Sequence, residues 1–77
     1  MVQTTTIPTP EAVAELKKRV RRLNSKAGQM KMDLHDLAEG LPTDYEKLIE
    51  EATKTYEIFD QLTELKKQLK NWESQLL

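Results

Sequence analysis

The sequence predicts an all-α fold, an antiparallel two-helix coiled-coil hairpin. In the first half of the chain, apolar residues recur at alternating spacings of three and four. A stripe that averages 3.5 residues per turn stays on one helix face only when the helix supercoils around a partner. Turn-forming residues then interrupt the chain near its middle, and a second apolar stripe follows. The first stripe comprises Val13, Leu16, Val20, Leu23, Ala27, Met30, Leu34, Leu37 and Leu41.

The first helix is predicted over residues 10–39. Thr9 suits an N-cap, Pro10 the first helical position, and Glu11 the positive end of the helix dipole. Gly40 can adopt the left-handed conformation of a C-cap, and Pro42 cannot continue the helix. At 1.5 Å per residue this helix spans roughly 45 Å.

The second helix is predicted over residues 44–75. Thr43 and Glu46 have the spacing of a capping box, in which each side chain satisfies a backbone N–H of the other. Two helices of similar length joined by about four residues fold back on each other. We therefore expect a single helical-hairpin domain over residues 9–77, preceded by a flexible tail over residues 1–8.

The second stripe is wider and less regular than the first. It runs through Tyr45, Leu48, Ala52, Thr55, Phe59 and Leu62, then after an extra three-residue step through Leu65, Leu69, Trp72 and Leu76. Such an offset is a stammer, which overwinds a supercoil locally. Ile49, Tyr56 and Ile58 lie beside the stripe, so this helix has apolar surface for two contacts. We expect a dimer that forms a four-helix bundle, or a higher oligomer, with an interface built from Tyr45, Ile49, Ala52, Tyr56 and Phe59.

Composition excludes several classes of protein. The 77 residues include no cysteine and one histidine, which removes disulfides, thiolate metal sites and a histidine-rich metal cage. A net charge of −1 does not attract nucleic acid to the whole molecule. No apolar run is long enough to span a membrane, and residues 1–10 do not read as a signal peptide, so we expect a cytoplasmic protein. With no phosphate-binding glycine loop and no nucleophile–base pair, we expect no enzymatic activity.

Basic residues gather at the end of the hairpin away from the turn. The candidates for partner docking are Lys17, Lys18, Arg21, Arg22, Lys66 and Lys67. They could bind RNA or an acidic protein, or they could form a solvated face that pairs with the acidic turn of another copy. No aromatic residue interrupts the basic run, which disfavours stacking on bases. RNA binding remains an alternative function, and the expected partner is a protein.

His35 and Glu39 lie one helical turn apart and could chelate a divalent metal. Glu46 and Glu50 follow shortly after the turn and could add ligands. The alternative is an ordinary exposed pair, because His35 is at an outward heptad position. We predict no cofactor, with a metal such as nickel or zinc held adventitiously between neighbouring molecules; a divalent-metal-binding protein is a second alternative function.

Gly28 lies in the middle of the first helix, where glycine costs about 1 kcal/mol relative to alanine. Two interpretations stay open. In one, a small residue is needed opposite the bulky side chains between Tyr56 and Phe59. In the other, the glycine is merely tolerated.

Two segments carry a family resemblance. Residues 36–42 (DLAEGLP) and 52–59 (ATKTYEIF), with Leu62 and Leu65 after them, resemble the small Rop-like proteins of unknown function encoded in nitrogen-fixation gene clusters of cyanobacteria and other diazotrophs. The resemblance covers about residues 10–72. It implies a two-helix protomer that dimerises and an accessory role around nitrogenase, in assembly or protection, with nitrogenase or its assembly proteins as partners. It implies no catalytic residues, and likeness to the RNA-binding protein Rop is a likeness of architecture alone.

Overall fold

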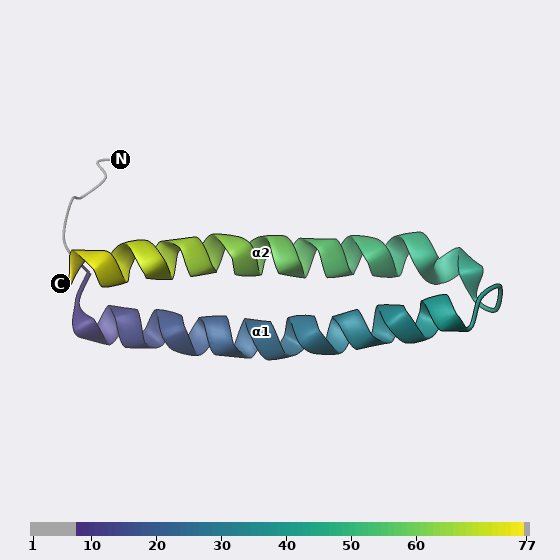
Figure 1. The fold of residues 1–77 in the computed structure, drawn as a ribbon, viewed down its shortest axis with the longest axis horizontal. Helices are drawn as coiled ribbons and strands as arrows, with labels where there is room; N and C mark the ends of the chain where they lie inside the picture. The colour runs from purple at the N-terminus through teal and green to yellow at the C-terminus, as the bar shows by residue number, and fades with distance from the viewer. Residues whose placement is uncertain (1–7, 77) are drawn as a thin grey trace.

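The protein is an antiparallel pair of long helices (Figure 1). The computed structural model describes residues 8–76, which contain α1 (Pro10–Glu39), the short 3₁₀ helix η1 (Tyr45–Lys47) and α2 (Leu48–Gln75). The molecule measures 52 × 25 × 14 Å, so it is a thin rod. The predicted all-α hairpin is confirmed. Residues 1–7 of the predicted tail, and Leu77 of the predicted domain, lie outside the described residues.

The start of α1 follows the predicted capping pattern. The Thr9 side-chain oxygen accepts a hydrogen bond from the Ala12 N–H at 3.0 Å, and Pro10 occupies the first helical position. Glu11 lies in the first turn, beside the N–H groups that carry the positive end of the helix dipole. These residues satisfy a backbone donor that the helix leaves free and fix where it begins.

The end of α1 differs from the prediction. Gly40 is not left-handed but has φ −84° and ψ −2°, and its N–H donates to the carbonyls of Asp36 and Leu37 at 3.1 and 3.2 Å. The left-handed residue is Asp44, with φ 57° and ψ 27°. Aspartate is one of the few non-glycine residues that adopt this conformation readily. The chain therefore leaves α1 through a series of hydrogen-bonded turns that contain a cis Leu41–Pro42 bond, and Asp44 is left-handed directly before η1.

The predicted capping box is also wrong. No side-chain hydrogen bond caps η1 or α2, so Thr43 and Glu46 do not cap each other across the start of a helix. Backbone groups close the turn instead: the Thr43 N–H donates to Gly40 and the Tyr45 N–H to Pro42. As a result residues 45–47 form a 3₁₀ turn and α2 begins at Leu48, four residues later than predicted.

The core is a single row of side chains between the helices. The first stripe is confirmed, because its members from Val13 to Leu37 are all buried or half-buried; Leu41, 40% exposed, lies past the end of α1. Ala27 is completely inaccessible, which places the closest approach of the helices near the centre of the rod. Within residues 8–76 the buried side chains are Val13, Leu16, Val20, Ala27, Ile58 and Leu62.

The stripe on α2 differs from the prediction at several positions. Its predicted first and last members, Tyr45 and Leu76, are 66 and 40% exposed, and Glu51 faces α1 beside the predicted Ala52. Ile58, only 7% exposed, takes the core position, whereas the predicted Phe59 is 38% exposed. The residues that face α1 then alternate at spacings of three and four without a break, and no stammer exists. They are Leu48, Glu51, Thr55, Ile58, Leu62, Leu65, Leu69 and Trp72. The regularity was hidden because the half-buried Glu51 is charged and Thr55 is polar.

Two polar contacts support this packing. The Thr55 hydroxyl donates to the Glu51 carbonyl at 2.8 Å, so its polar atom is satisfied by its own helix and its methyl group can face α1. Lys17 of α1 pairs with Glu73 of α2 at 3.2 Å. Both side chains of the pair are about half exposed, which limits the contribution of this pair to about 1 kcal/mol or less.

Gly28 is exposed, and a Cβ atom placed on it would meet no atom within 4 Å. The side chains from Tyr56 to Phe59 therefore do not lie against Gly28 within the protomer. The first interpretation, that these bulky side chains require a glycine opposite them, is wrong for the single chain. Its helical backbone conformation is one that alanine adopts at lower entropic cost.

We expect Gly28→Ala to raise the free energy of unfolding by about 1 kcal/mol, because alanine restricts the unfolded chain and fits the open space. Thermal unfolding followed by circular dichroism should show a midpoint roughly 4–8 °C higher. A lower midpoint would contradict this expectation and would mean that another chain covers Gly28 in solution.

Candidate protein-interaction surfaces

One face of α2 and η1 exposes large apolar side chains. Tyr45, Ile49 and Tyr56 are 66, 77 and 71% exposed, and Phe59 is 38% exposed. Together with the half-buried Ala52 they succeed one another at spacings of four, three, four and three. The spacing aligns the members from Ile49 to Phe59 on one side of α2, and Tyr45 precedes them in η1. We call Tyr45, Ile49, Ala52, Tyr56 and Phe59 the α2 stripe. These are the residues predicted for an oligomer interface, and in the single chain nothing covers most of their surface.

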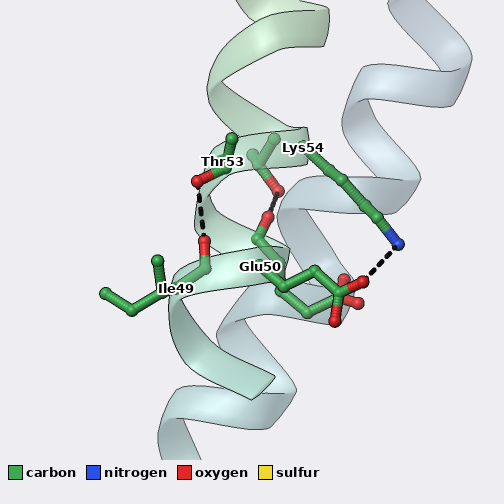
Figure 2. A network of polar contacts seen from close by, with 6 residues as sticks. Ile49, Glu50, Thr53 and Lys54 are labelled. Carbon is green, nitrogen blue, oxygen red and sulfur yellow. Dashed lines mark hydrogen bonds and ion pairs between the residues drawn. The ribbon is translucent and has the colours of Figure 1, made fainter. Parts of the chain in front are cut away.

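Figure 2 shows Ile49, one member of the stripe, together with its polar neighbours on α2. The Ile49 side chain points away from α1, while Glu50 and Lys54 form an ion pair at 3.6 Å on another side of α2. The Thr53 hydroxyl donates to the Ile49 carbonyl at 2.8 Å. Thr63 does the same with the Phe59 carbonyl, so these hydroxyls are directed to their own helix rather than outward to a partner.

A groove runs between the helices, and no residue of the α2 stripe lines it. Three adjoining cavities form it, of about 510, 400 and 280 Å³. The largest shares Arg19 with the smallest, and shares Leu23, Lys26 and Gln61 with the second. Leu23 and Leu65 are half-buried members of the core whose remaining surface opens into the largest cavity.

The two walls of this groove carry opposite charges along its largest cavity, whereas Glu15 at one end of the α1 wall and Lys54 at the other end of the α2 wall have the reverse sign. On α1 the wall contains Arg19, Arg22 and Lys26, which we call the basic row. On α2 it contains Glu57, Asp60 and Glu64, the acidic row. Within residues 8–76 no ion pair joins one row to the other. Glu64 is paired with Lys67 of its own helix at 3.6 Å, and the other five charges of the two rows have no ion-pair partner within residues 8–76. These five are therefore available to a molecule lying in the groove.

The predicted docking residues do not form one patch. All six are exposed, but Lys17 is paired with Glu73 and Lys67 with Glu64. Arg22 alone among the six lines the groove. Arg21 directly precedes Arg22, so it points in another direction around α1, whereas Lys18 lies one helical turn before Arg22 but lines none of the cavities. The structure does not gather these cations on a single face.

The predicted metal ligands come together only in part. The His35 Nε2 atom lies 3.6 Å from the Glu39 Oε2 atom, with both side chains well exposed. Glu50 is paired with Lys54 instead, and residues 8–76 contain no cluster of three or more histidine, cysteine or acidic side chains suited to a metal ion. One protomer thus offers two ligands, and completing a site would require ligands from another molecule or from water.

The described residues contain no buried polar or charged side chain. In addition, neither α1 nor α2 has an apolar stretch of the length that crosses a bilayer. The chemistry that this rod offers is therefore that of its surfaces: an apolar stripe, and a groove with charged walls.

A family model described as Rop-like matches residues 11–74. The chain belongs to the Rop-like family. This match spans both helices and the turn, so it covers the α2 stripe and both walls of the groove.

Individual relatives agree with this assignment. A UPF0437 protein from Nostoc sp. is 62% identical over 63 residues, covering 82% of this chain and 89% of its own. A UPF0437 protein from Frankia alni, described as lying in the nifX–nifW intergenic region, is 45% identical over 49 residues, or 64% of this chain and 60% of its own. The crystal structure of a DUF683-family protein from the cyanobacterium Cyanothece 51142 superposes with a TM-score of 0.86 at 76% identity, covering 91% of this chain and 99% of that one.

The groove was missed by sequence reasoning, although a signal for it exists. The basic row has spacings of three and four, and the acidic row has the same spacings on the other helix. Each row is therefore a helix edge of one sign. The two edges border one groove only because of how α1 and α2 pair. The periodicity of either helix alone does not predict that register.

We expect calorimetric titration with nickel to show weak binding to the wild-type chain that His35→Ala abolishes, because the histidine is one of only two ligands present. Glu50→Gln should leave the heat unchanged, since Glu50 is engaged by Lys54. Equal heats for wild type and His35→Ala would show that His35 binds no metal.

Proposed function

We propose that the chain is a non-enzymatic, cytoplasmic accessory protein of nitrogen fixation that acts by binding a protein partner. The observation that carries the proposal is the apolar surface that the protomer leaves uncovered, on the α2 stripe and at Leu23 and Leu65 in the groove. Monomeric proteins rarely expose contiguous apolar patches of this kind without a binding role. The position of the Frankia alni relative between nifX and nifW supports the link to nitrogen fixation and points to nitrogenase or its assembly proteins as clients.

The absence of buried polar groups in residues 8–76 favours a binding role over catalysis. Catalytic acids, bases and nucleophiles depend on a desolvated environment that tunes their reactivity. Here the charged side chains lie along exposed helix edges, where water screens them.

We further propose that the α2 stripe forms a homodimer. A protomer with six buried apolar residues has little core to offset the conformational entropy of two long helices. Burying one large apolar side chain contributes about 1.5–3 kcal/mol. Covering Tyr45, Ile49, Tyr56 and Phe59 in each protomer would therefore supply stabilisation that the hairpin alone lacks.

The stripe is symmetric about Ala52, which favours an antiparallel pairing of α2 with α2 of the partner. Tyr45 and Phe59 lie seven residues on either side of Ala52, and Ile49 and Tyr56 lie three and four residues away. A two-fold axis at Ala52 would bring Tyr45 against the partner's Phe59, and Ile49 against the partner's Tyr56. Alanine at the centre permits close approach of the two backbones. The turn-side halves would overlap, leaving both basic ends free.

We expect sedimentation equilibrium to give a dimer for the wild-type chain. Ile49→Glu or Tyr56→Glu should weaken the dimer about 100-fold or more, because each symmetric interface would bury two carboxylates. Asn24→Glu places the same charge on α1, away from the stripe, and should leave the dimer intact. Unchanged association of the Ile49 and Tyr56 variants would refute the interface.

A cross-link tests the register independently of stability. Because the chain has no cysteine, Ala52→Cys introduces a single thiol. Mild oxidation should convert this variant to a disulfide-linked dimer, since a disulfide requires Cα atoms about 4.4–6.8 Å apart. Thr53→Cys should cross-link far more slowly. Equal cross-linking at the two positions would exclude a two-fold axis at Ala52.

We expect tagged protein to recover nitrogenase or its assembly proteins from nitrogen-fixing cells and not from nitrogen-replete cells, with recovery unaffected by nuclease. Deletion should impair diazotrophic growth or nitrogenase maturation. Recovery that nuclease abolishes would favour the RNA-binding alternative, and normal growth without any co-purified partner would refute an accessory role.

A further inference from the structure

The groove between α1 and α2 has the length and continuity of a helix-binding site. Its cavities share lining residues and extend along α1 from Ala12 to Met30. At 1.5 Å per residue that distance is about 27 Å, or five helical turns. Two adjacent helices present ridges and a central furrow into which a third helix packs.

The floor of the groove is apolar and only partly covered. Leu23, Met30, Leu65 and Trp72 pack against the buried core, yet each remains half-buried and lines one of the cavities. These side chains already have fixed neighbours on one side. A helix laid over their free side would bury further apolar surface without reorganising the core.

The walls define what kind of helix fits. The basic row (Arg19, Arg22 and Lys26) borders one side of the floor and the acidic row (Glu57, Asp60 and Glu64) borders the other. A complementary helix would carry acidic residues on the flank that meets α1 and basic residues on the flank that meets α2. A nucleic acid backbone would meet the carboxylates of the acidic row, which disfavours it.

We propose that this groove binds an amphipathic α-helix of a partner protein, with an apolar row flanked by acidic residues on one side and basic residues on the other. The inference rests on the proposed function and specifies the chemistry of the docked segment. The split charge also fixes direction, because turning the helix end for end would exchange its flanks and oppose like charges.

A second copy of this chain fits the groove less well. Its α1 carries cations on both flanks of the apolar stripe, with Lys17 and Lys31 on one flank and Arg19 and Lys26 on the other. One of those flanks would lie against the basic row in either direction. The α2 stripe, proposed above as the dimer contact, lines none of the cavities, so groove and dimer can be occupied together.

Three labelled peptides test the proposal by fluorescence anisotropy with the full chain at low salt. Each has about 21 residues and the same leucine row. The split peptide has glutamate on one flank and lysine on the other; the second has glutamate on both flanks and the third lysine on both. The split peptide should bind about tenfold more tightly than either of the others, because it alone opposes both walls with the correct sign.

Reversal of one wall should invert this order. The double variant Arg22→Glu/Lys26→Glu leaves Arg19 as the one cation of the basic row, so two carboxylates on that wall lie opposite the acidic row. The split peptide should then bind about tenfold more weakly, and the all-lysine peptide should become the tightest ligand. Lys18→Glu/Lys31→Glu makes the same total charge change on α1 outside the groove and should preserve the original order. Circular dichroism of each variant verifies that the hairpin is intact, since these side chains are exposed.

An unchanged order in the double variant, or no binding of the split peptide to the wild-type chain, would overturn the proposal. If the double variant instead lowered the oligomeric state without peptide, the occupant would be a second copy, which also overturns it. The peptide assay needs no cell extract, so its failure would leave the recovery of nitrogenase proteins as a separate test of the accessory role.

Discussion

The contact between α1 and α2 along one narrow row of side chains is the constraint on which the rest of the structure depends. Two helices can share only a single seam, and here that seam buries only six apolar side chains of the described residues. In proteins, helices are stabilised mainly by packing of their apolar face rather than by intrinsic helix propensity. Every other apolar group, including the α2 stripe and the floor of the groove, is therefore left with surface that the protomer cannot cover, and this surplus explains why a chain of 77 residues has two candidate interaction surfaces.

The sequence predicts the hairpin well because periodicity and capping act locally. Thr9 and Pro10 fix the start of α1, and the stripe from Val13 to Leu37 identifies its buried face. The predictions are wrong where one local sequence pattern is compatible with two conformations or two packing arrangements. Gly40 can be left-handed but does not have to be, and Asp44 adopts that conformation instead. Ile58 and Phe59 are both apolar, so the position that enters the core depends on where α1 lies.

The surfaces were predictable to different degrees. The α2 stripe follows from the excess width of the apolar face, and its residues are exposed as expected, although Ala52 is half-buried. The six docking cations were chosen by charge density along the chain, which does not record direction around a helix. Consequently Arg22 faces the groove while Lys17 and Lys67 are held by nearby glutamates. The basic and acidic rows border one groove because the helices are antiparallel and in a particular register.

The arrangement of the helix ends has a mechanical consequence. The first residue of α1 and the last residue of α2 lie at the same end of the rod, with the turn at the other (Figure 1). A pulling force between those ends breaks the contacts between α1 and α2 one after another, starting from that end, rather than all at the same time. Opening thus begins at that end and proceeds towards the turn, and local unfolding is least costly there. A ligand that contacts both helices between Ala12 and Met30 would therefore hinder this opening.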